Sequence, residues 1–572
     1  MNYRKPSAYV LGLVALLLMF NCRQAPDLEV KTPVNRGLIT ENAMVVTARV
    51  EASKIGSAVL EQGGNAFDAM FATEMALAVA YPFAGNLGGG GFMVYRDKDG
   101  NTGAIDYREK APLKAHRDMY LDEAGNIIPE KSTYGAMAVG VPGTVAGVFA
   151  VHERFGTLPI EVLLKPVIEL AKNGVVVTQK QETRLEGYKD AFRKVNQDTI
   201  PLERNWKVND TIKYPALAET LERILVNGRD EFYKGKTAEV LTEFIQDQGG
   251  IISMEDLNRY EAKWRDPVVF EYDDLKIISM SPPSSGGVCL GQIMKMVEPY
   301  DLHEFGHNSL KAVQVITEAE RRAYADRSFY LGDPDFNEIP IDEILADSYL
   351  ERRMSDFSFK AATASESISH GQVMVMESAE TTHYSIIDQF GNAVSVTTTL
   401  NGGYGSKLYS PELGFFLNNE MDDFSSKPGV PNMFGLIGAE ANSIAAEKRM
   451  LSSMTPTIVE RDDQLYMVVG TPGGSTIITS VLQTILNVHE FDMGMQDAVD
   501  APRFHHQWLP DLISIEPNRF PEELKEQLKS KGYSILERNN SIIGKVNAIL
   551  ILTDGTLEGG ADHRGDDTAV GF

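Results

Sequence analysis

The chain has 572 residues, of which 43% are hydrophobic and 23% charged, an ordinary globular composition. Its formal net charge of −26 argues against a nucleic-acid partner and against binding to an anionic membrane surface. The length exceeds one typical hydrophobic core and by itself suggests several domains.

Residues 1–22 have the pattern of a signal peptide. Arg4 and Lys5 form a charged start, and the apolar run 8–20 is shorter than the roughly 20 residues of a membrane-spanning helix. We therefore expect an exported protein, periplasmic or extracellular. Cys22 follows Met-Phe-Asn, which resembles a bacterial lipoprotein box without its usual leucine. Lipidation of Cys22 and ordinary cleavage nearby are the two alternatives.

The first two thirds of the chain predict helices with a few strands. A strand at 44–48 precedes helices at 53–62 and 65–80, the second capped by Asn65 and ended by Pro82. Further helical patterns lie at 140–155, 160–173 (restarted at Pro166), 216–226, 236–247 and 309–330. We expect these helices to form outer layers.

The sequence predicts neither a cofactor nor a disulfide. A glycine-rich loop at 85–91 follows a helix and precedes a strand at 92–96, the reverse of the order in a dinucleotide-binding motif. We interpret these glycines as points of close backbone packing. Cys289 is the only cysteine after Cys22, so an internal disulfide is not expected.

Residues 381–401 predict a β-hairpin with its turn at 388–392. In its second arm, polar residues alternate with apolar ones and share one face; they are Ser395, Thr397, Thr399 and Asn401. A solvated sheet face would also explain this pattern. An odd loop with a bulge would place Thr381 opposite Asn401 and on the face of Thr399.

Cleavage of the chain before Thr381 would supply this threonine with its own base. A threonine hydroxyl needs a base to take its proton, and a free α-amine has an unperturbed pKa of about 7.7–8.0. Residues 377–380 are small or polar, which suits an exposed scissile bond between Glu380 and Thr381. Residues 361–380 are interpreted as the mobile linker that carries this bond.

At this point residues 381–401 resemble the start of the small subunit of the γ-glutamyltranspeptidases, a family of N-terminal-nucleophile hydrolases. The similarity runs from about residue 40 to the C-terminus. Further matching motifs lie at 106–112, 282–287, 323–336, 417–432, 451–459, 470–483 and 501–510. The resemblance implies an α+β fold, a four-layer αββα sandwich in which a large and a small subunit interleave in one core.

The resemblance also implies the domain organisation and the reaction. A signal peptide at 1–22 would precede a large subunit at 23–380 and a small, catalytic subunit at 381–572. The precursor would cut itself before Thr381. The mature enzyme would form a γ-glutamyl ester on Thr381 from glutathione or related compounds and pass it to water or to the amine of an amino acid or peptide, without a cofactor.

The same resemblance assigns the substrate-binding residues. Arg108, Ser452 and Ser453 would hold the substrate α-carboxylate, and an arginine suits this task because its planar fork binds carboxylates bidentately. Glu420 and Asp423 would hold the α-ammonium group. Histidines at metal-ligand spacing are missing around these carboxylates, so no metal is predicted.

The remaining assignments concern the reacting bond. Thr399 would hydrogen-bond to Thr381, while Gly473, Gly474 and Asn401 would stabilise the oxyanion. Phe434 would close the pocket as part of a lid at 428–442. His505 and His506 are interpreted as structural, and Asp566 and Asp567 match family positions without an assigned role.

Three alternatives stay open. A related glutaryl or β-lactam acylase would lack the clamp for the ammonium group, here Glu420 and Asp423, and some such acylases lack the lid. A glutamate-polymer hydrolase would also tend to lack the lid. An uncut, inactive binding protein would not need an intact Thr381.

Overall fold

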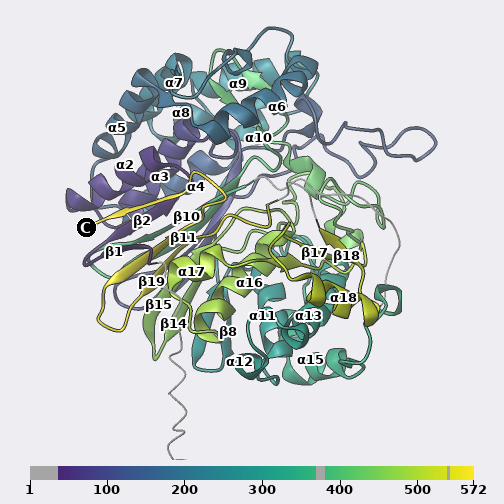
Figure 1. The fold of residues 1–572 in the computed structure, drawn as a ribbon. Helices are drawn as coiled ribbons and strands as arrows, with labels where there is room; N and C mark the ends of the chain where they lie inside the picture. Colours follow the sequence, from purple (N-terminus) through teal and green to yellow (C-terminus); the bar gives the residue numbers. More distant parts are fainter. Residues whose placement is uncertain (1–35, 369–380, 538–541) are drawn as a thin grey trace, which may run out of the picture. The chain divides into compact units, whose positions relative to one another are not determined.

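Two antiparallel sheets lie face to face at the centre of the fold (Figure 1). The computed structural model describes residues 36–368, 381–537 and 542–572. In these residues the first sheet has the order β21 (Thr568–Gly571), β2 (Met44–Thr47), β10 (Thr382–Ile387), β11 (Ala393–Thr399), β3 (Gly90–Arg96), β4 (Thr102–Asp106) and β7 (Lys263–Arg265). The second sheet has the order β1 (Leu38–Thr40), β20 (Leu557–Ala561), β19 (Asn547–Ile551), β15 (Gln464–Gly470), β14 (Thr457–Arg461), β9 (Leu275–Ser279) and β8 (Val268–Tyr272).

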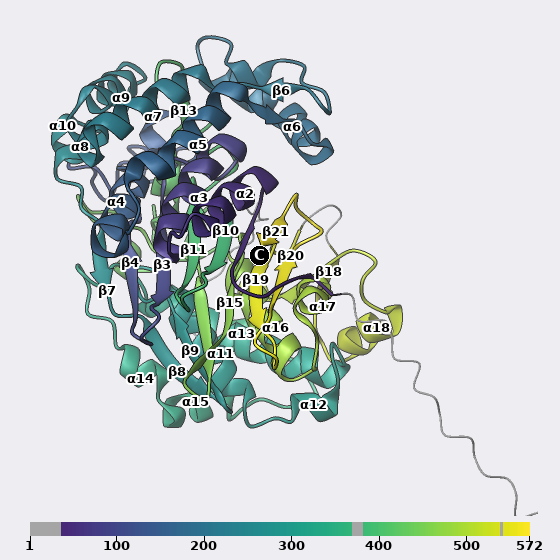
Figure 2. The same cartoon turned by 90° about the vertical axis from the view of Figure 1, so that its left-hand side faces the viewer.

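Helices cover the outer face of each sheet (Figures 1 and 2). The first sheet is covered by α2 (Val50–Glu61), α3 (Ala66–Ala80), α4 (Thr144–Phe155), α5 (Ile160–Asn173), α6 (Gln179–Val195), α7 (Pro215–Asn227), α8 (Arg229–Tyr233), α9 (Lys236–Asp247) and α10 (Met254–Asn258). The second is covered by α11 (Gly286–Val297), α12 (Leu302–Phe305), α13 (Leu310–Tyr330), α14 (Ile341–Leu345), α15 (Asp347–Met354), α16 (Thr476–His489), α17 (Met495–Asp500) and α18 (Glu522–Ser530). This is the predicted four-layer αββα sandwich.

Smaller strand pairs complete the described part of the chain. They are β5 (Val175–Val176) with β6 (Thr211–Ile212), β12 (Tyr409–Ser410) with β13 (Phe415–Phe416), and β16 (Phe504–His505) with β17 (Ile513–Ile515) and β18 (Ile535–Glu537).

The helix α3 explains why the first layer is so well buried. Every residue of α3 is buried, because the helix is apolar around almost its whole circumference and packs between the first sheet and other helices. Asn65 caps its first turn in a capping box with Asp68, as its position in the sequence predicted. The predicted restart of α5 at Pro166 is wrong. This helix continues through the proline because burial of its apolar face outweighs one lost backbone hydrogen bond.

The glycine-rich loop before β3 is a point of close backbone packing, as predicted. A Cβ atom on Gly89 would overlap the carbonyl oxygen of Thr399, and one on Gly91 would lie 2.6 Å from the carbonyl oxygen of Thr397. Any side chain here would therefore push β3 away from β11.

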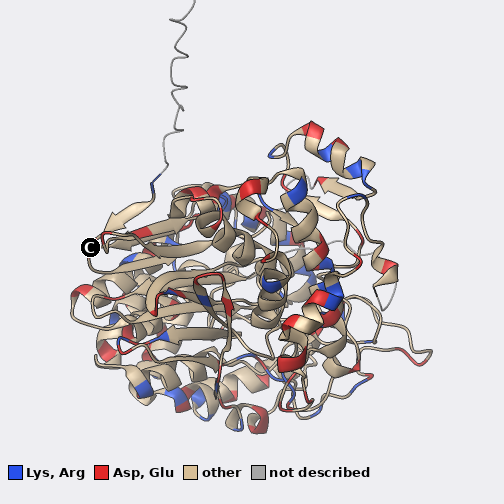
Figure 3. Ribbon diagram, turned by 90° about the horizontal axis from the view of Figure 1, so that it is seen from below, with Lys and Arg blue, Asp and Glu red and all other residues tan. Residues whose placement is uncertain are grey.

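Three further points concern the charged surface, membrane-spanning helices and the residues that the structure does not describe. Acidic and basic residues are interspersed along the helices in the view of Figure 3. In the described ranges, every helix is too short or too polar to cross a membrane. The predicted leader with Cys22, and Glu380 with the preceding residues 369–379, lie outside the described residues.

Candidate active site

The candidate nucleophile lies directly before β10, on the side of the hairpin that faces the second sheet. β10 and β11 pair in register, beginning with Thr382 opposite Thr398. Extended by one residue, this register sets Thr381 opposite Thr399, and their Oγ1 atoms lie 3.4 Å apart. Thr381 is only 5% exposed. The hydroxyl face predicted from the alternating pattern is therefore an interior face between the sheets rather than a solvated one.

The loop of this hairpin corrects one prediction. It has an odd number of residues, 388–392, as predicted, and Gly391 has a φ of 93°. The predicted bulge and the pairing of Thr381 with Asn401 are wrong, because the loop is centred on Phe390 and not on Gly391. The Asp388 carboxylate fixes this centre by accepting hydrogen bonds from the backbone amides of Phe390 and Asn392.

Asn401 follows β11 and contacts Thr399 instead. Its backbone N–H donates to Thr399 Oγ1 at 2.7 Å, which orients that hydroxyl toward Thr381. The Asn401 side-chain amide donates to the carbonyl oxygen of Asn419 at 3.0 Å. Asn401 has a φ of 71°, a left-handed conformation that asparagine tolerates better than most residues.

A buried arginine surrounded by carboxylates lies beside Thr381. Arg108 Nη1 is 2.7 Å from Glu420 Oε2, and Arg108 Nη2 is 2.5 Å from Asp423 Oδ2. Glu109 lies 3.8 Å from the same guanidinium. Burial raises the pKa of Glu420 well above its usual value and that of Glu109 to about 8, and it also raises the pKa of Asp423. Arg108 thus forms one ion-pair cluster with Glu420 and Asp423, the two residues predicted to hold the substrate ammonium group.

Two serines and a second arginine complete the polar wall. Ser453 Oγ accepts from Arg327 Nη2 at 3.1 Å, and Arg327 Nε donates to Ser285 Oγ at 2.9 Å. The Ser452 carbonyl accepts from the backbone N–H of Ser285 at 2.8 Å, so the motif at 282–287 supports this wall.

Arg327 was missed in the sequence analysis. It is 4% exposed, and burial lowers its pKa. The sequence signal for this residue was its position in the family motif 323–336. The first part of this motif lies in α13, from which Arg327 reaches the pocket lining.

A glycine turn lies on the other side of Thr381, at the start of α16. Gly473 has a φ of 150° and Gly474 a φ of 57°. The carbonyl oxygen of Gly473 accepts from the backbone N–H of Thr476, which fixes the turn against the helix. A Cβ atom on Gly474 would lie 2.9 Å from the ring of Phe434, so the aromatic ring packs directly on this turn.

The lid at 428–442 contacts both the carboxylates and the glycine turn. Asn432 Nδ2 donates to Asp423 Oδ1 at 3.1 Å, and the backbone N–H of Met433 donates to Asp422 Oδ2 at 2.9 Å. Phe434 is 4% exposed. The aromatic residue therefore lies where the sequence analysis expected it.

These elements enclose one small pocket. Its lining includes most of the predicted site residues, namely Arg108, Thr381, Thr399, Asn401, Asp423, Phe434, Ser452, Ser453 and Gly474, together with Arg327. Its free volume is about 20 Å³, roughly the room for a water molecule. A substrate larger than water therefore requires side chains of the lining to move.

The two predicted structural histidines have internal partners. His505 Nδ1 lies 2.9 Å from Thr479 Oγ1, and His506 Nε2 lies 3.3 Å from Asp511 Oδ1. Burial lowers the pKa of His506 to about 4. His506 is therefore neutral at physiological pH, and neither histidine lines the pocket.

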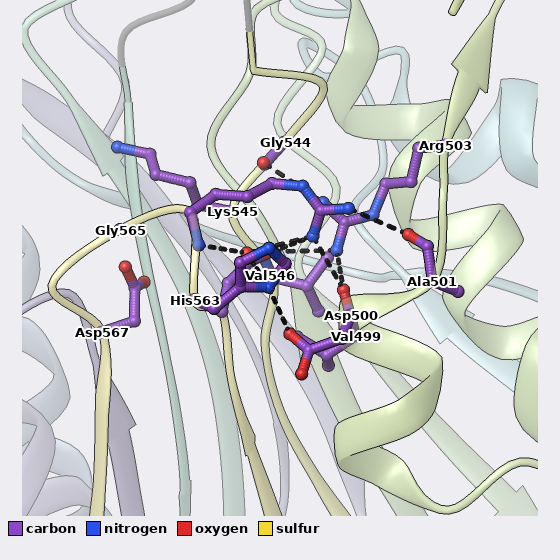
Figure 4. Close-up of polar contacts among 12 residues, drawn as sticks. Val499, Asp500, Ala501, Arg503, Gly544, Lys545, Val546, His563, Gly565 and Asp567 are labelled. Atoms are coloured by element: carbon purple, nitrogen blue, oxygen red, sulfur yellow. Dashed lines mark hydrogen bonds and ion pairs between the residues drawn. The ribbon is translucent and has the colours of Figure 1, made fainter. Parts of the chain in front are cut away.

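Two groups in the described chain have metal-ligand geometry, Asp273–Asp274–His489 and Asp500–Asp562–His563. The second is already paired internally: His563 Nδ1 lies 2.6 Å from Asp500 (Figure 4), and Asp562 lies 2.8 Å from Arg503. Neither group lines the pocket.

Asp566 and Asp567 hold the C-terminal segment. Asp566 accepts from Thr178 Oγ1 at 2.7 Å, and Asp567 accepts from Asn547 Nδ2 at 2.8 Å. Burial raises the pKa of Asp567 to about 7. Asp566 thus joins the C-terminal segment to the start of α6, and Asp567 joins it to β19 of the second sheet.

Comparison with known proteins gives a consistent result. The γ-glutamyltranspeptidase family model matches residues 52–572. The glutathione hydrolase proenzyme of Escherichia coli strain K12 is 41% identical over 99% of this chain and 100% of its own length. The glutathione hydrolase proenzyme of Pseudomonas sp. strain A14 is 46% identical over 86% of each chain.

Solved structures agree with these relatives. The γ-glutamyltranspeptidase of Helicobacter pylori superposes with a TM-score of 0.56 at 41% identity, covering 61% of this chain and 98% of that one. A cephalosporin acylase from Bacillus halodurans superposes with a TM-score of 0.84 over 96% of this chain and 99% of its own, but at 23% identity. The acylase therefore supports the fold alone.

Proposed function

This chain belongs to the γ-glutamyltranspeptidase family, and on that premise we propose which of its residues carry the chemistry. It is a self-processing γ-glutamyltransferase and glutathione hydrolase with a threonine nucleophile, made as a proenzyme that is processed into two subunits and acts on small molecules. The acylase alternative is not favoured. One observation carries the assignment of residues: Thr381 shares a pocket with Arg108 and Asp423.

Self-cleavage occurs between Glu380 and Thr381 in this proposal, giving subunits 23–380 and 381–572. The Thr381 hydroxyl attacks the Glu380 carbonyl, the acyl group moves from nitrogen to oxygen, and water hydrolyses the resulting ester. The position of Thr381 directly before β10 supports this assignment, because the strand and the contact with Thr399 hold the attacking hydroxyl in place.

The freed amine of Thr381 then acts as the base. It takes the proton of the Thr381 hydroxyl as the oxygen attacks the γ-carbonyl of the substrate. Thr399, 3.4 Å away, holds the hydroxyl in place. The leaving amine takes a proton, and the γ-glutamyl ester passes to water or to an acceptor amine, which predicts ping-pong kinetics.

The charged cluster suits a zwitterionic substrate end. In the free site Arg108 is paired with Asp423 and Glu420. An entering α-carboxylate, with help from Ser452 and Ser453, takes over the guanidinium, while the α-ammonium group takes over the carboxylates. Each buried charge thus exchanges one partner for another, which avoids an unpaired ion in the pocket. Binding at this end positions the γ-carbonyl at Thr381.

The glycine turn supplies the oxyanion donors. Gly474 lines the pocket and Gly473 precedes it, so neither amide has a side chain in its way, and Pro472 has no amide hydrogen to offer. Losing one such donor typically costs about 2.7–4 kcal/mol of transition-state stabilisation. Asn401 is the further candidate donor, provided that its side chain leaves the carbonyl of Asn419.

Glutathione or a related γ-glutamyl compound is the proposed donor, and an amino acid or dipeptide the proposed acceptor. The names of the relatives support glutathione as the donor. The leader at residues 1–22 supports export, with Cys22 as the site of lipidation if the leader is of the lipoprotein type.

Intact mass and N-terminal sequencing of the purified protein, followed by a chromogenic γ-glutamyl anilide, test this proposal. Two chains are expected, the smaller beginning Thr-Thr-His-Tyr-Ser, together with release of the anilide. Thr381→Ala should remain a single inactive chain. A cut or active Thr381→Ala protein would show that another residue is the nucleophile.

A further inference from the structure

We propose that Gln507 is a positioning residue that connects the lid to the oxyanion turn. The lid is the segment 428–442, and the oxyanion turn is the segment 472–475. This inference rests on the proposed function, because it concerns how the same site is held together. Gln507 lies in the loop after β16 and is 6% exposed.

The carbonyl end of the Gln507 side chain holds the oxyanion turn. Ser475 Oγ donates to Gln507 Oε1 at 2.6 Å, and His505 Nε2 lies 2.9 Å from the same oxygen. The carbonyl oxygen of Ser475 accepts a hydrogen bond from the hydroxyl of Tyr324. Ser475 directly follows Gly474, so these contacts limit how far the two glycine amides can rotate.

The amide end of the same side chain faces the lid. Gln507 Nε2 donates to the carbonyl oxygen of Phe434 at 3.4 Å and to that of Leu509 at 3.3 Å. The ring of Phe434 packs on Gly474, where no Cβ would fit without moving it. Lid and turn therefore meet at the aromatic ring and are joined a second time through one buried amide group.

The opposite side of the lid contacts the clamp. Asn432 donates to Asp423, the carboxylate proposed to hold the substrate ammonium group. Clamp, lid and oxyanion turn thus form a continuous series of contacts across the pocket. Because the free pocket has room for about one water molecule, a substrate must displace part of its lining, and we place this movement in the lid. Gln507 would restore the turn geometry each time Phe434 returns.

Gln483 offers a matched control in the same layer. This glutamine is also buried, and its side-chain amide donates to the carbonyl oxygens of Thr479 and Phe504. Its hydrogen-bond partners belong to α16 and β16, and none belongs to the lid or the oxyanion turn in the described contacts. Gln483→Leu therefore measures the general effect of removing a buried glutamine amide beside α16.

The test compares Gln507→Leu with Gln483→Leu for maturation, thermal unfolding and hydrolysis of a γ-glutamyl anilide. We expect both to mature. Gln507→Leu should lower kcat at least tenfold more than Gln483→Leu at a similar unfolding temperature. Phe434→Ala should cost much less in the Gln507→Leu background than in the native enzyme, because both changes break the same connection.

Gln507→Glu distinguishes the contact of the side-chain oxygen with Ser475 from that of the side-chain nitrogen with Phe434. The glutamate keeps an acceptor for Ser475, but when ionised it cannot donate to the carbonyl oxygen of Phe434. We expect kcat closer to native than in Gln507→Leu, with a raised KM. This KM should approach the native value at lower pH, where a protonated carboxyl group again donates to Phe434.

Three results would overturn the inference. These are equal losses in Gln507→Leu and Gln483→Leu, additive effects of Gln507→Leu and Phe434→Ala, or an uncut Gln507→Glu chain with native thermal stability. The last result would assign Gln507 to self-cleavage instead. Failure of the proposed function would look different, since Thr381→Ala would then be active whatever residue stands at 507.

Discussion

At the scale of single residues, burial raises the pKa values of the carboxylates around one guanidinium. Arg108 lies among Glu109, Glu420 and Asp423. Burial raises the pKa of Glu109 to about 8, so this residue holds a proton near neutral pH, and it also raises the pKa of Glu420 well above its usual value. Asp423 is the carboxylate closest to the guanidinium and is its principal negative partner.

This distribution of charge predicts unequal effects of two conservative substitutions. Asp423→Asn should lower kcat/KM for a γ-glutamyl anilide by 10- to 100-fold, corresponding to roughly 1.5–3 kcal/mol for a lost hydrogen bond to a charged group. Glu420→Gln should change it by less than about fivefold, because glutamine has nearly the same shape and keeps an oxygen acceptor for Arg108. Steady-state kinetics of the matured enzymes would measure both.

A glutaryl anilide, which lacks the α-amine, is the control for this prediction. Asp423→Asn should not impair its slow hydrolysis further. An equal loss with both substrates would assign Asp423 to the structure of the pocket and not to the ammonium group.

His383 predicts how stability depends on pH. It is fully buried between Thr397 and Ser385, and burial lowers its pKa to about 3. Below pH 6.5 the unfolded chain binds a proton at this residue that the folded chain does not bind. The free energy of unfolding is therefore unaffected by His383 above pH 6.5 and decreases as the pH falls from 6.5 toward 3. Between pH 7 and pH 4.5 this residue should cost about 3 kcal/mol, at 1.36 kcal/mol for each pH unit below 6.5.

Urea unfolding of the uncut Thr381→Ala chain would measure this loss, because one chain unfolds without dissociation. The reference is Thr381→Ala with His383→Gln. Between pH 7 and pH 4.5, its free energy of unfolding should decrease by about 3 kcal/mol less than that of Thr381→Ala alone. Equal pH dependence of the two chains would show that His383 is not buried as a neutral ring.

At the scale of elements, the hairpin β10–β11 is held by two strands opposite it in the second sheet, β19 and β15. Ser385 Oγ donates to the carbonyl oxygen of Asn547 at 3.0 Å, and Ser395 Oγ donates to that of Val469, also at 3.0 Å. Gly470 ends β15 directly beneath the ring of His383. The polar face of the hairpin is thus satisfied across the gap between sheets, which makes the position of Thr381 rigid.

Gly470→Ala should disturb this packing. The added methyl group would overlap the imidazole of His383, and overpacking of this kind costs typically 1–3 kcal/mol. We expect a lower unfolding temperature and slower self-cleavage, which gel analysis over time would measure. In the double variant Gly470→Ala with His383→Ser, the serine leaves room for the added methyl group, so part of the stability should return. If the double variant is as unstable as the sum of its parts, the two residues do not compete for the same space.

At the scale of the whole molecule, the proposed cleavage falls between strands that share a sheet. In the first sheet β10 and β11 lie between β2 and β3, and in the second β20, β19, β15 and β14 lie between β1 and β9. Strands from before and after residue 381 are therefore hydrogen-bonded neighbours in both sheets. Cutting the chain removes one covalent bond but none of the ladders that join the two parts.

The two chains of the matured enzyme should consequently remain together at high salt. Backbone ladders and buried apolar side chains join them, and these contacts are not screened as surface ion pairs are. Size-exclusion chromatography in about 1 M salt should give a single complex, and only denaturant should separate the chains. Separation by salt alone would contradict the interleaved arrangement.

The αββα class was implied by the family resemblance. The sequence by itself determined the hairpin with its polar face, the odd loop and the tight packing of the glycine loop. These follow from alternation, helical periodicity and turn chemistry, which act over a few residues. The site residues were assigned from the motifs that carry the family resemblance, which is why most of the pocket lining was named in advance.

Only the tertiary structure decided the rest. The pairing of Thr381 with Thr399, the ion pairs that join Arg108 to its presumed ammonium-binding neighbours, the place of Arg327 and the two contacts of Gln507 all join segments far apart in the chain. Such contacts depend on loop length, on the direction in which each helix turns its side chains and on burial. These properties are set by the packing of the four layers together and leave no periodic pattern in the sequence.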